Sequence, residues 1–124
     1  MLILIQNLKM KRIYEALEPD DGFRVLVDRL WPRGVKKEVA KVDLWMKEIA
    51  PSPELRKWFC HDPELFPQFR EYYLNELKDD PLHKEQVELL EQKVMEEPVT
   101  LLYAAKDQVH NHAIVLYEFL LDKK

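Results

Sequence analysis

Two clusters of side chains carry the residue types that could do chemistry, and each follows an apolar run. The first follows Val25–Val27 and consists of Asp28, Arg29, Trp31 and Arg33. Guanidinium groups bind carboxylates or phosphates through paired hydrogen bonds, and an indole offers a stacking face. This trio of two arginines and a tryptophan favours an anionic ligand. The structural alternative is that Arg29 pairs with an acid, Trp31 is core and Arg33 is solvated.

The second cluster lies on the loop before the predicted last helix and consists of Lys106, Asp107, Asn111 and His112. The unpaired N–H groups and the dipole at a helix start favour an anion. His112 could serve as an acid, a base or a phosphate donor, or form only a structural hydrogen bond. Asn111 has the residue type of a helix N-cap. We expect these four residues to contribute to a ligand site.

Asp28 ends an apolar run and admits several roles. It could be a general base, a metal ligand, or the partner that fixes Arg29 or a loop N–H. Neighbouring arginines stabilise the charged carboxylate and make it a poorer base, which favours the structural role. If the protein is an enzyme, Asp28 and His112 are the predicted proton carriers, while the arginines hold the anion.

Further histidines and a single cysteine give weaker signals. His110 and His112 share a face on a strand but not on a helix, and no paired spacing of a metal motif supports them. Cys60 and His61 are adjacent, whereas catalytic pairs usually meet through the fold. We therefore predict neither a metal site nor a cofactor. Arg56 is a candidate third arginine for the pocket, with exposure on the surface as the alternative.

The elements that must position these residues follow from apolar patterning and helix-start signals. Strands are predicted within 2–14, at 23–28 and at 99–104, and the last two are apolar on both faces, as in central parallel strands. Asp43 is placed to cap a short helix through Leu44, Trp45 and Ile49. Further helices are predicted after Ser52 and Asp62, over 82–97 and from 111 or 112 to 121. In the helix after Ser52, Leu55, Trp58 and Phe59 form the expected buried stripe.

The predicted elements follow the order strand, helical segment, strand, helix. This order predicts an α/β fold, with a small, mainly parallel sheet and helices packed on both faces. The 124 residues form one compact domain, with 1–7 as an N-terminal extension. In such sheets ligands bind beyond the carboxyl ends of the strands. The two clusters should therefore meet at one edge.

Composition narrows the class of protein. The chain is 47% hydrophobic and 34% charged with a net charge of -4, which is typical of a globular protein and disfavours nucleic acid as a general partner. The apolar start is too short to span a bilayer and lacks a signal-peptide pattern. One cysteine fits a reducing compartment. We expect a cytoplasmic protein without a membrane partner.

Three motifs resemble a known family. They are Val-Leu-Val-Asp-Arg-Leu-Trp-Pro-Arg-Gly (25–34), Ala-Pro-Ser-Pro-Glu-Leu-Arg-Lys-Trp-Phe (50–59), and Leu-Leu-Tyr-Ala-Ala-Lys-Asp with Asn-His-Ala (101–107 and 111–113). They are similar to the YeaO-like group within the domain-of-unknown-function family DUF488. The resemblance covers about residues 11–121 and implies an α/β fold without an established activity. Cys60 stands where the related pattern usually has glycine or another residue, and His110 falls in a variable part, whereas Asn111 and His112 match.

Two functions remain open. The first is binding of an anionic ligand, carrying phosphate or carboxylate, at the carboxyl ends of the central strands, with or without catalysis. The second is a non-catalytic interaction module that contacts a protein or single-stranded nucleic acid through Trp31 and the arginines.

Overall fold

A parallel sheet forms the centre of the protein. The computed structural model describes residues 7–122, and in this part of the chain four strands lie in the order β1-β4-β2-β3, all parallel. The strands are β1 (Leu8–Arg12), β2 (Phe23–Leu26), β3 (Leu44–Trp45) and β4 (Val99–Tyr103). The predicted α/β class is confirmed. Of the predicted N-terminal extension, only Asn7 lies within the described residues.

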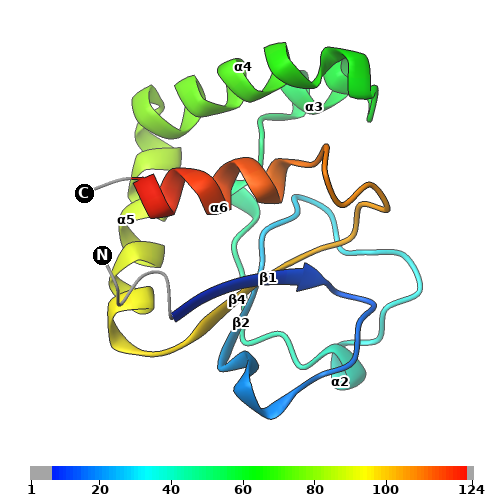
Figure 1. Cartoon of the computed structure of the whole chain (residues 1–124), viewed down its shortest axis with the longest axis vertical. Coiled ribbons are helices and arrows are strands. Elements are labelled where there is room, and N and C mark those ends of the chain that lie inside the picture. Colours follow the sequence, from blue (N-terminus) through cyan, green and yellow to red (C-terminus); the bar gives the residue numbers. More distant parts are fainter. Residues whose placement is uncertain (1–6, 123–124) are drawn as a thin grey trace.

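Helices surround the sheet, as Figure 1 shows. They are α2 (Lys37–Ala40), α3 (Pro53–Phe59), α4 (Phe66–Asp79), α5 (Pro81–Glu96) and α6 (His112–Asp122), with short 3-10 turns at η1 (Pro19–Asp21), η2 (Lys47–Ile49) and η3 (Pro63–Leu65). In Figure 1, α6 lies between α4 and the sheet. No helix among residues 7–122 is both long and apolar enough to cross a membrane.

The two central strands are buried on both faces, as their continuous apolar runs predict. Val25 and Leu101 pack into the main core with α4, α5 and α6. Leu26 and Leu102 point the other way, into a smaller cluster with Ala40. The second face is therefore covered mainly by the 28–43 segment and its one-turn helix α2, while the long helices cover the first.

Helices α3 and α5 both begin at a side-chain cap, of which Ser52 is the one that the sequence predicts. Ser52 Oγ accepts a hydrogen bond from the N–H of Leu55 at 3.2 Å, with Pro53 in the first turn of α3. Asp80 accepts from the N–H of His83 at 3.0 Å at the start of α5. Pro67 lies in the first turn of α4, where its missing N–H leaves no intrahelical bond unmade.

The predicted helix through Leu44, Trp45 and Ile49 is wrong for its first half. Leu44–Trp45 form β3, which pairs with Val25 and Leu26 of β2, and only η2 is helical. Asp43 does not cap a helix, because its Oδ2 accepts the N–H of Arg24 at 2.9 Å. The free edge of β2 provides backbone hydrogen-bond partners for residues 44–45, and these partners cannot be predicted from the local sequence.

Trp58 is a second correction. The helical spacing predicted a buried side chain, but Trp58 is 41% exposed. Its ring instead packs edge-on against Tyr72 of α4, with ring centroids 5.3 Å apart. Only Leu55 and Phe59 of α3 reach the core, because this helix has just seven residues and lies at the rim.

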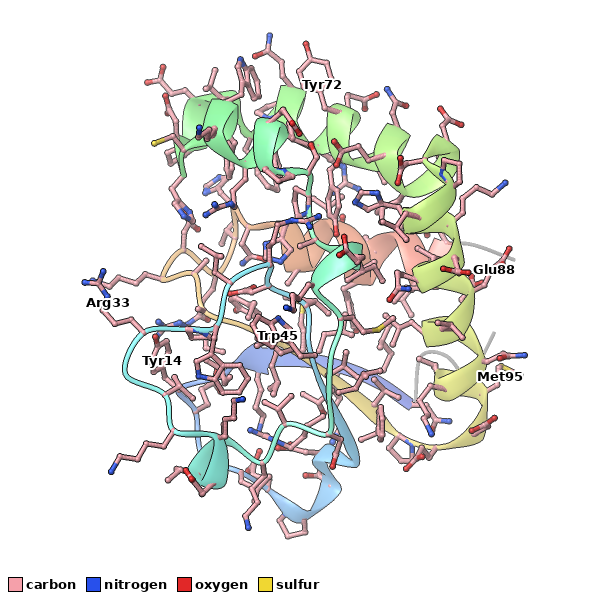
Figure 2. The ribbon with its side chains drawn as sticks, turned by 180° about the vertical axis from the view of Figure 1, so that it is seen from behind. Tyr14, Arg33, Trp45, Tyr72, Glu88 and Met95 are labelled. Carbon is pink, nitrogen blue, oxygen red and sulfur yellow. The ribbon has the colours of Figure 1, made fainter. Side chains whose placement is uncertain are left out.

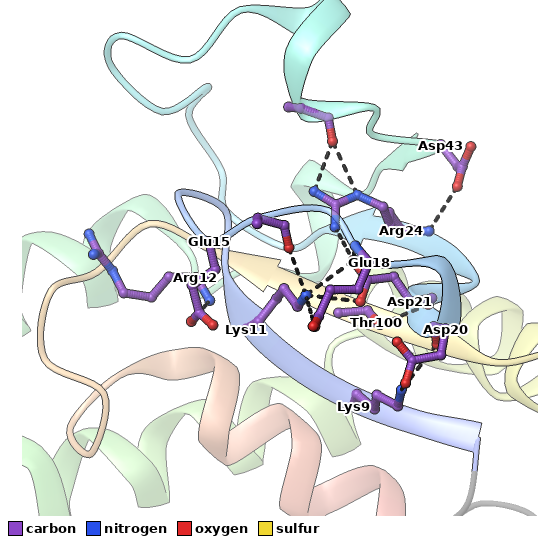
Figure 3. A network of polar contacts seen from close by, with 12 residues as sticks. Lys9, Lys11, Arg12, Glu15, Glu18, Asp20, Asp21, Arg24, Asp43 and Thr100 are labelled. Carbon is purple, nitrogen blue, oxygen red and sulfur yellow. Dashed lines mark hydrogen bonds and ion pairs between the residues drawn. The ribbon is translucent and has the colours of Figure 1, made fainter.

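A polar network ties the second face of the sheet together (Figure 3). The buried guanidinium of Arg24 contacts the carboxylate of Asp21 and donates two hydrogen bonds to Ala40 O, at 3.1 and 2.8 Å. Lys11 also pairs with Asp21 at 2.9 Å, and Thr100 Oγ1 donates to Asp21 O at 2.8 Å. The network joins η1, both central strands and the end of α2, and it fixes the strands that lead to the candidate site.

Candidate functional site

A pocket of about 510 Å³ opens at the carboxyl ends of β2 and β4. The two strands are parallel neighbours, so the loops that follow them must emerge at one edge. Figure 1 shows these loops, cyan after β2 and orange after β4, on the same side of the molecule. Asp28, Arg29, Lys106, Asp107, Asn111 and His112 all line the pocket. Six of the eight predicted site residues are therefore brought together.

Asp28 and His112 meet at the inner end of this pocket. Asp28 Oδ2 accepts the N–H of Ala104 at 3.1 Å, which joins the two loops. His112 Nε2 lies 3.0 Å from Val27 O and 3.2 Å from Asp28 Oδ1. A carbonyl only accepts, so Nε2 carries the hydrogen and donates it to Val27 O. Asp28 Oδ1 is then buried close to the imidazole without a hydrogen bond from residues 7–122.

Arg29 lines the pocket, but most of its hydrogen-bonding capacity is used by the pocket wall. Its Nε donates to Pro51 O at 3.2 Å and its Nη2 to Ala50 O at 3.1 Å. Its Nη1 pairs with Glu48 Oε1 at 3.2 Å. Arg29 therefore holds the 48–51 segment in place, and its pairing with Glu48 matches the structural alternative, in which Arg29 pairs with an acid.

The opposite wall is held by an arginine that the sequence analysis did not single out. Arg12, at the end of β1, donates from Nε to Ala105 O at 2.9 Å and from Nη2 to Ala104 O at 3.0 Å. A lone arginine at the end of an edge strand carries no signal in sequence, because its target is a backbone segment 92 residues further along the chain.

The loop before α6 is organised by Asp107. Its Oδ1 accepts the N–H groups of Val109 and His110, both at 2.9 Å, and its Oδ2 contacts His110 Nδ1 at 2.9 Å. The backbone N–H groups of His110 and Val109, followed by the His110 side chain, lower the pKa of Asp107 to about 2. Asn111 is the N-cap of α6, since its Oδ1 accepts from Ile114 N at 2.9 Å. Both residues therefore shape the loop.

Trp31 and Arg33 lie outside the pocket. The indole of Trp31 donates to Val35 O at 2.8 Å and packs edge-on against Trp45, with centroids 5.4 Å apart. Arg33 is exposed and extends away from the molecule in Figure 2, near Tyr14. The side chain of Trp31 packs against the smaller apolar cluster of the second face, whereas that of Arg33 lies in solvent. Trp31 and Arg33 therefore do not share one open surface.

Several pocket residues come from the helical layer, and one of them, Arg56, is the candidate third arginine that the sequence predicts for the pocket. Arg56 and Phe59 of α3, His61 after it and Phe69 of α4 contribute to the wall. The 49–52 segment is fixed from α4 and α5. Tyr73 donates to Ile49 O at 2.6 Å, His83 Nε2 lies 2.7 Å from Ala50 O, and Glu76 Oε1 accepts from Ser52 N at 3.0 Å. The helix periodicity predicts burial of Tyr73 but not its hydrogen bond.

The acidic side chains of the pocket have partners, whereas two of its basic side chains have no acidic partner among residues 7–122. Both acids have at least one partner: Asp107 accepts from the loop backbone and contacts His110, and Asp28 accepts from Ala104 N through Oδ2, while its Oδ1 lies close to His112. Among residues 7–122, the side chains of Arg56 and Lys106 have no acidic partner. Two cations at the pocket are therefore available to an incoming anion.

Metal-binding groups gather elsewhere. Within the described chain, the side chains spaced to share a metal are Glu18, Asp20 and Asp21. Lysine and arginine side chains already pair with them: Lys9 with Asp20, Lys11 with Glu18 and Asp21, and Arg24 with Asp21. Neither His110 nor His112 belongs to that group, and His110 Nδ1 is already bonded to Asp107.

Comparison with known proteins places the chain in a family. A family model described as "Inactive DUF488-N3 subclade" matches residues 7–124. The chain belongs to the DUF488 family. The chain is also similar to "Uncharacterized protein YeaO" of Escherichia coli (strain K12), which is 46% identical over 114 residues, covering 92% of this chain and 96% of the relative. "Uncharacterized protein Rv3073c" of Mycobacterium tuberculosis (strain ATCC 25618 / H37Rv) is 42% identical over 114 residues, covering 92% and 93%. No solved structure matches the chain.

Proposed function

We propose that this DUF488 protein binds a small anionic molecule, bearing a phosphate or a carboxylate, in the pocket beyond β2 and β4. The observation that carries the proposal is the pair of cations, Arg56 and Lys106, that line the pocket without an acidic partner in the described chain. Both side chains are exposed, and a guanidinium or ammonium group forms stronger, charge-assisted hydrogen bonds with an anion than with a neutral group, so an anion that contacts both gains affinity. The start of α6 at His112 adds the favourable end of a helix dipole.

Binding without turnover fits this site best. The matching family model carries the word "inactive" in its description, and the geometry gives Asp28 and His112 structural partners. Asp28 receives the N–H of Ala104, and His112 donates to Val27 O. Catalysis by Asp28 and His112 stays a prediction of the sequence, as does a cytoplasmic location.

Calorimetric titration with inorganic phosphate, sulfate and small carboxylates tests the proposal. We expect Arg56→Ala and Lys106→Ala each to weaken anion binding by about three- to tenfold, as expected for loss of one partly exposed charge, and added salt to weaken it further. Arg33→Ala and Lys36→Ala are matched controls, because both side chains are exposed and neither lines the pocket.

Two results would contradict anion binding in this pocket. One is that no anion, organic anions included, binds the wild-type protein. The other is that Arg33→Ala weakens binding as much as Arg56→Ala, which would move the site to another surface.

A further inference from the structure

The pocket is walled mainly by carbon, although charged groups stand at its rim. We infer that its ligand is an amphipathic anion, in which the phosphate or carboxylate is joined to a compact apolar body of the size of an aromatic ring. This inference rests on the proposed function, because the anionic group is what Arg56 and Lys106 hold. It adds the chemical class of the remainder of the ligand.

The first support is the apolar lining. Phe59 and Phe69 form the inner wall, stacked with centroids 4.2 Å apart and an angle of 20° between their planes. Pro51 and the small side chains of Ala50, Ala104 and Ala105 complete the sides. Such walls gain free energy from a ligand in proportion to the apolar area that it covers.

The second support is that the polar backbone groups of these walls are already used. Ala50 O accepts from Arg29 and faces His83 Nε2, and Pro51 O accepts from Arg29. On the other side, Ala104 O and Ala105 O accept from Arg12, while Ala104 N donates to Asp28.

A sugar in this pocket would therefore lose the hydrogen bonds that water gave its hydroxyl groups, with few replacements from the walls. An apolar body carries no such cost. The hydrogen-bonded walls thus discriminate against a hydroxylated body and in favour of hydrocarbon.

The third support is Leu30, which lies at the pocket and is 60% exposed. An exposed apolar side chain and two cations without an acidic partner, all lining one pocket, are an arrangement that an amphipathic anion would cover. The volume agrees, since about 510 Å³ lies within the range of roughly 300–1,000 Å³ of pockets that enclose organic ligands. A bare inorganic anion would leave most of this space unfilled.

Comparing the affinities of phosphates that differ only in the attached group measures how much that group contributes to binding. Titration of the wild-type protein compares inorganic phosphate, ribose 5-phosphate and phenyl phosphate, with phenol as the uncharged ring and benzoate as the carboxylate equivalent. We expect phenyl phosphate to bind at least about tenfold more tightly than inorganic phosphate, ribose 5-phosphate or phenol.

Leucine variants test whether the phenyl ring of the ligand binds in this pocket. Leu30→Ser should lower the affinity for phenyl phosphate by about three- to tenfold while changing that for inorganic phosphate little. Leu17→Ser is the matched control, since Leu17 is also a half-exposed leucine of a loop and does not line the pocket. Because both leucines are exposed, neither change removes a core side chain.

The outcomes separate the two proposals. If ribose 5-phosphate or inorganic phosphate binds as tightly as phenyl phosphate, the apolar body is overturned and anion binding stands. If phenol binds as tightly as phenyl phosphate, or if none of the anions bind, both proposals are overturned. Equal losses from Leu30→Ser and Leu17→Ser would also overturn the placement of the apolar body in this pocket.

Discussion

At the scale of single residues, the arginines around the pocket have different roles because they have different hydrogen-bond partners. Arg12 and Arg29 donate to backbone carbonyls and hold the two walls of the pocket, whereas Arg56 reaches the same pocket without an acidic partner among residues 7–122. A guanidinium that is already hydrogen-bonded on several sides has less capacity for a ligand. The proposed anion binding therefore depends on the residues that the scaffold does not use.

Cys60 gives a prediction at this scale. It ends α3 in the left-handed conformation, with φ 48°, and its N–H donates to Arg56 O at 3.0 Å. Glycine adopts this conformation without the steric cost that a Cβ imposes. We expect Cys60→Gly to raise the free energy of unfolding by about 0.5–1 kcal/mol, measured by urea denaturation.

Cys60→Ala is the control for that prediction. Alanine also lacks the thiol but keeps the Cβ, so its stability should stay near that of the wild type. A Cys60→Gly protein less stable than Cys60→Ala would show that the backbone at residue 60 is not strained.

At the scale of elements, the sheet depends on close backbone approach where β2 begins. Gly22 has φ 64°, and a Cβ at this position would lie 2.3 Å from Pro98 O. The N–H of Phe23 donates to that same carbonyl at 2.8 Å, which aligns β2 with β4. A side chain at Gly22 would push the two central strands apart.

The two glycines form a matched pair of tests. We expect Gly22→Ala to lower the free energy of unfolding by about 2–4 kcal/mol, from the left-handed conformation and from the clash together. Gly34 has φ 77°, but no atom of residues 7–122 would lie within 4 Å of a Cβ there, so Gly34→Ala should cost only about 1 kcal/mol. Equal losses in thermal or urea unfolding would contradict the proposed role of the contact with Pro98.

At the scale of the whole molecule, the helical layer both covers the main core and holds the pocket. Tyr73 of α4 is fully buried and its hydroxyl donates to Ile49 O at 2.6 Å, next to the wall at Ala50. Burial raises the pKa of Tyr73 well above its usual range, and the negative charges of Glu76 and Asp28 raise it further. The fold therefore favours the neutral phenol.

Tyr73→Phe tests this connection. Loss of the hydroxyl leaves Ile49 O without its buried donor and should lower the free energy of unfolding by about 1–2 kcal/mol at neutral pH. The raised pKa means that the wild type keeps this contribution below the ordinary tyrosine pKa of 10.0 and loses stability as the pH rises above it.

Urea denaturation at neutral pH and above about pH 10 measures both effects. The Tyr73→Phe variant should lose less stability than the wild type over this alkaline range, because it has no phenol to ionise at residue 73. Tyr72→Phe is the control, since Tyr72 is half exposed on the same helix. Identical alkaline losses in Tyr73→Phe and the wild type would contradict the role of this phenol.

The sequence by itself determined the class of fold and the edge of the sheet at which the predicted site residues gather. Continuous apolar runs at Val25–Val27 and Val99–Tyr103 require burial on both faces, and parallel strands bring the loops after them together. Helix starts at Ser52 and Asn111 were likewise predictable, because their side chains bond to N–H groups only three residues away.

Only the tertiary structure decided what each site residue contacts. Trp31 packs against the smaller apolar cluster, whereas Arg33 lies in solvent. Arg29 donates hydrogen bonds to the carbonyls of residues 50 and 51, and Leu44–Trp45 pair with β2 as a strand. These outcomes depend on partners far away in the chain, whose positions local propensity and spacing do not specify. The apolar wall and the free pair Arg56 and Lys106 arise in the same way, where distant segments pack around a common pocket.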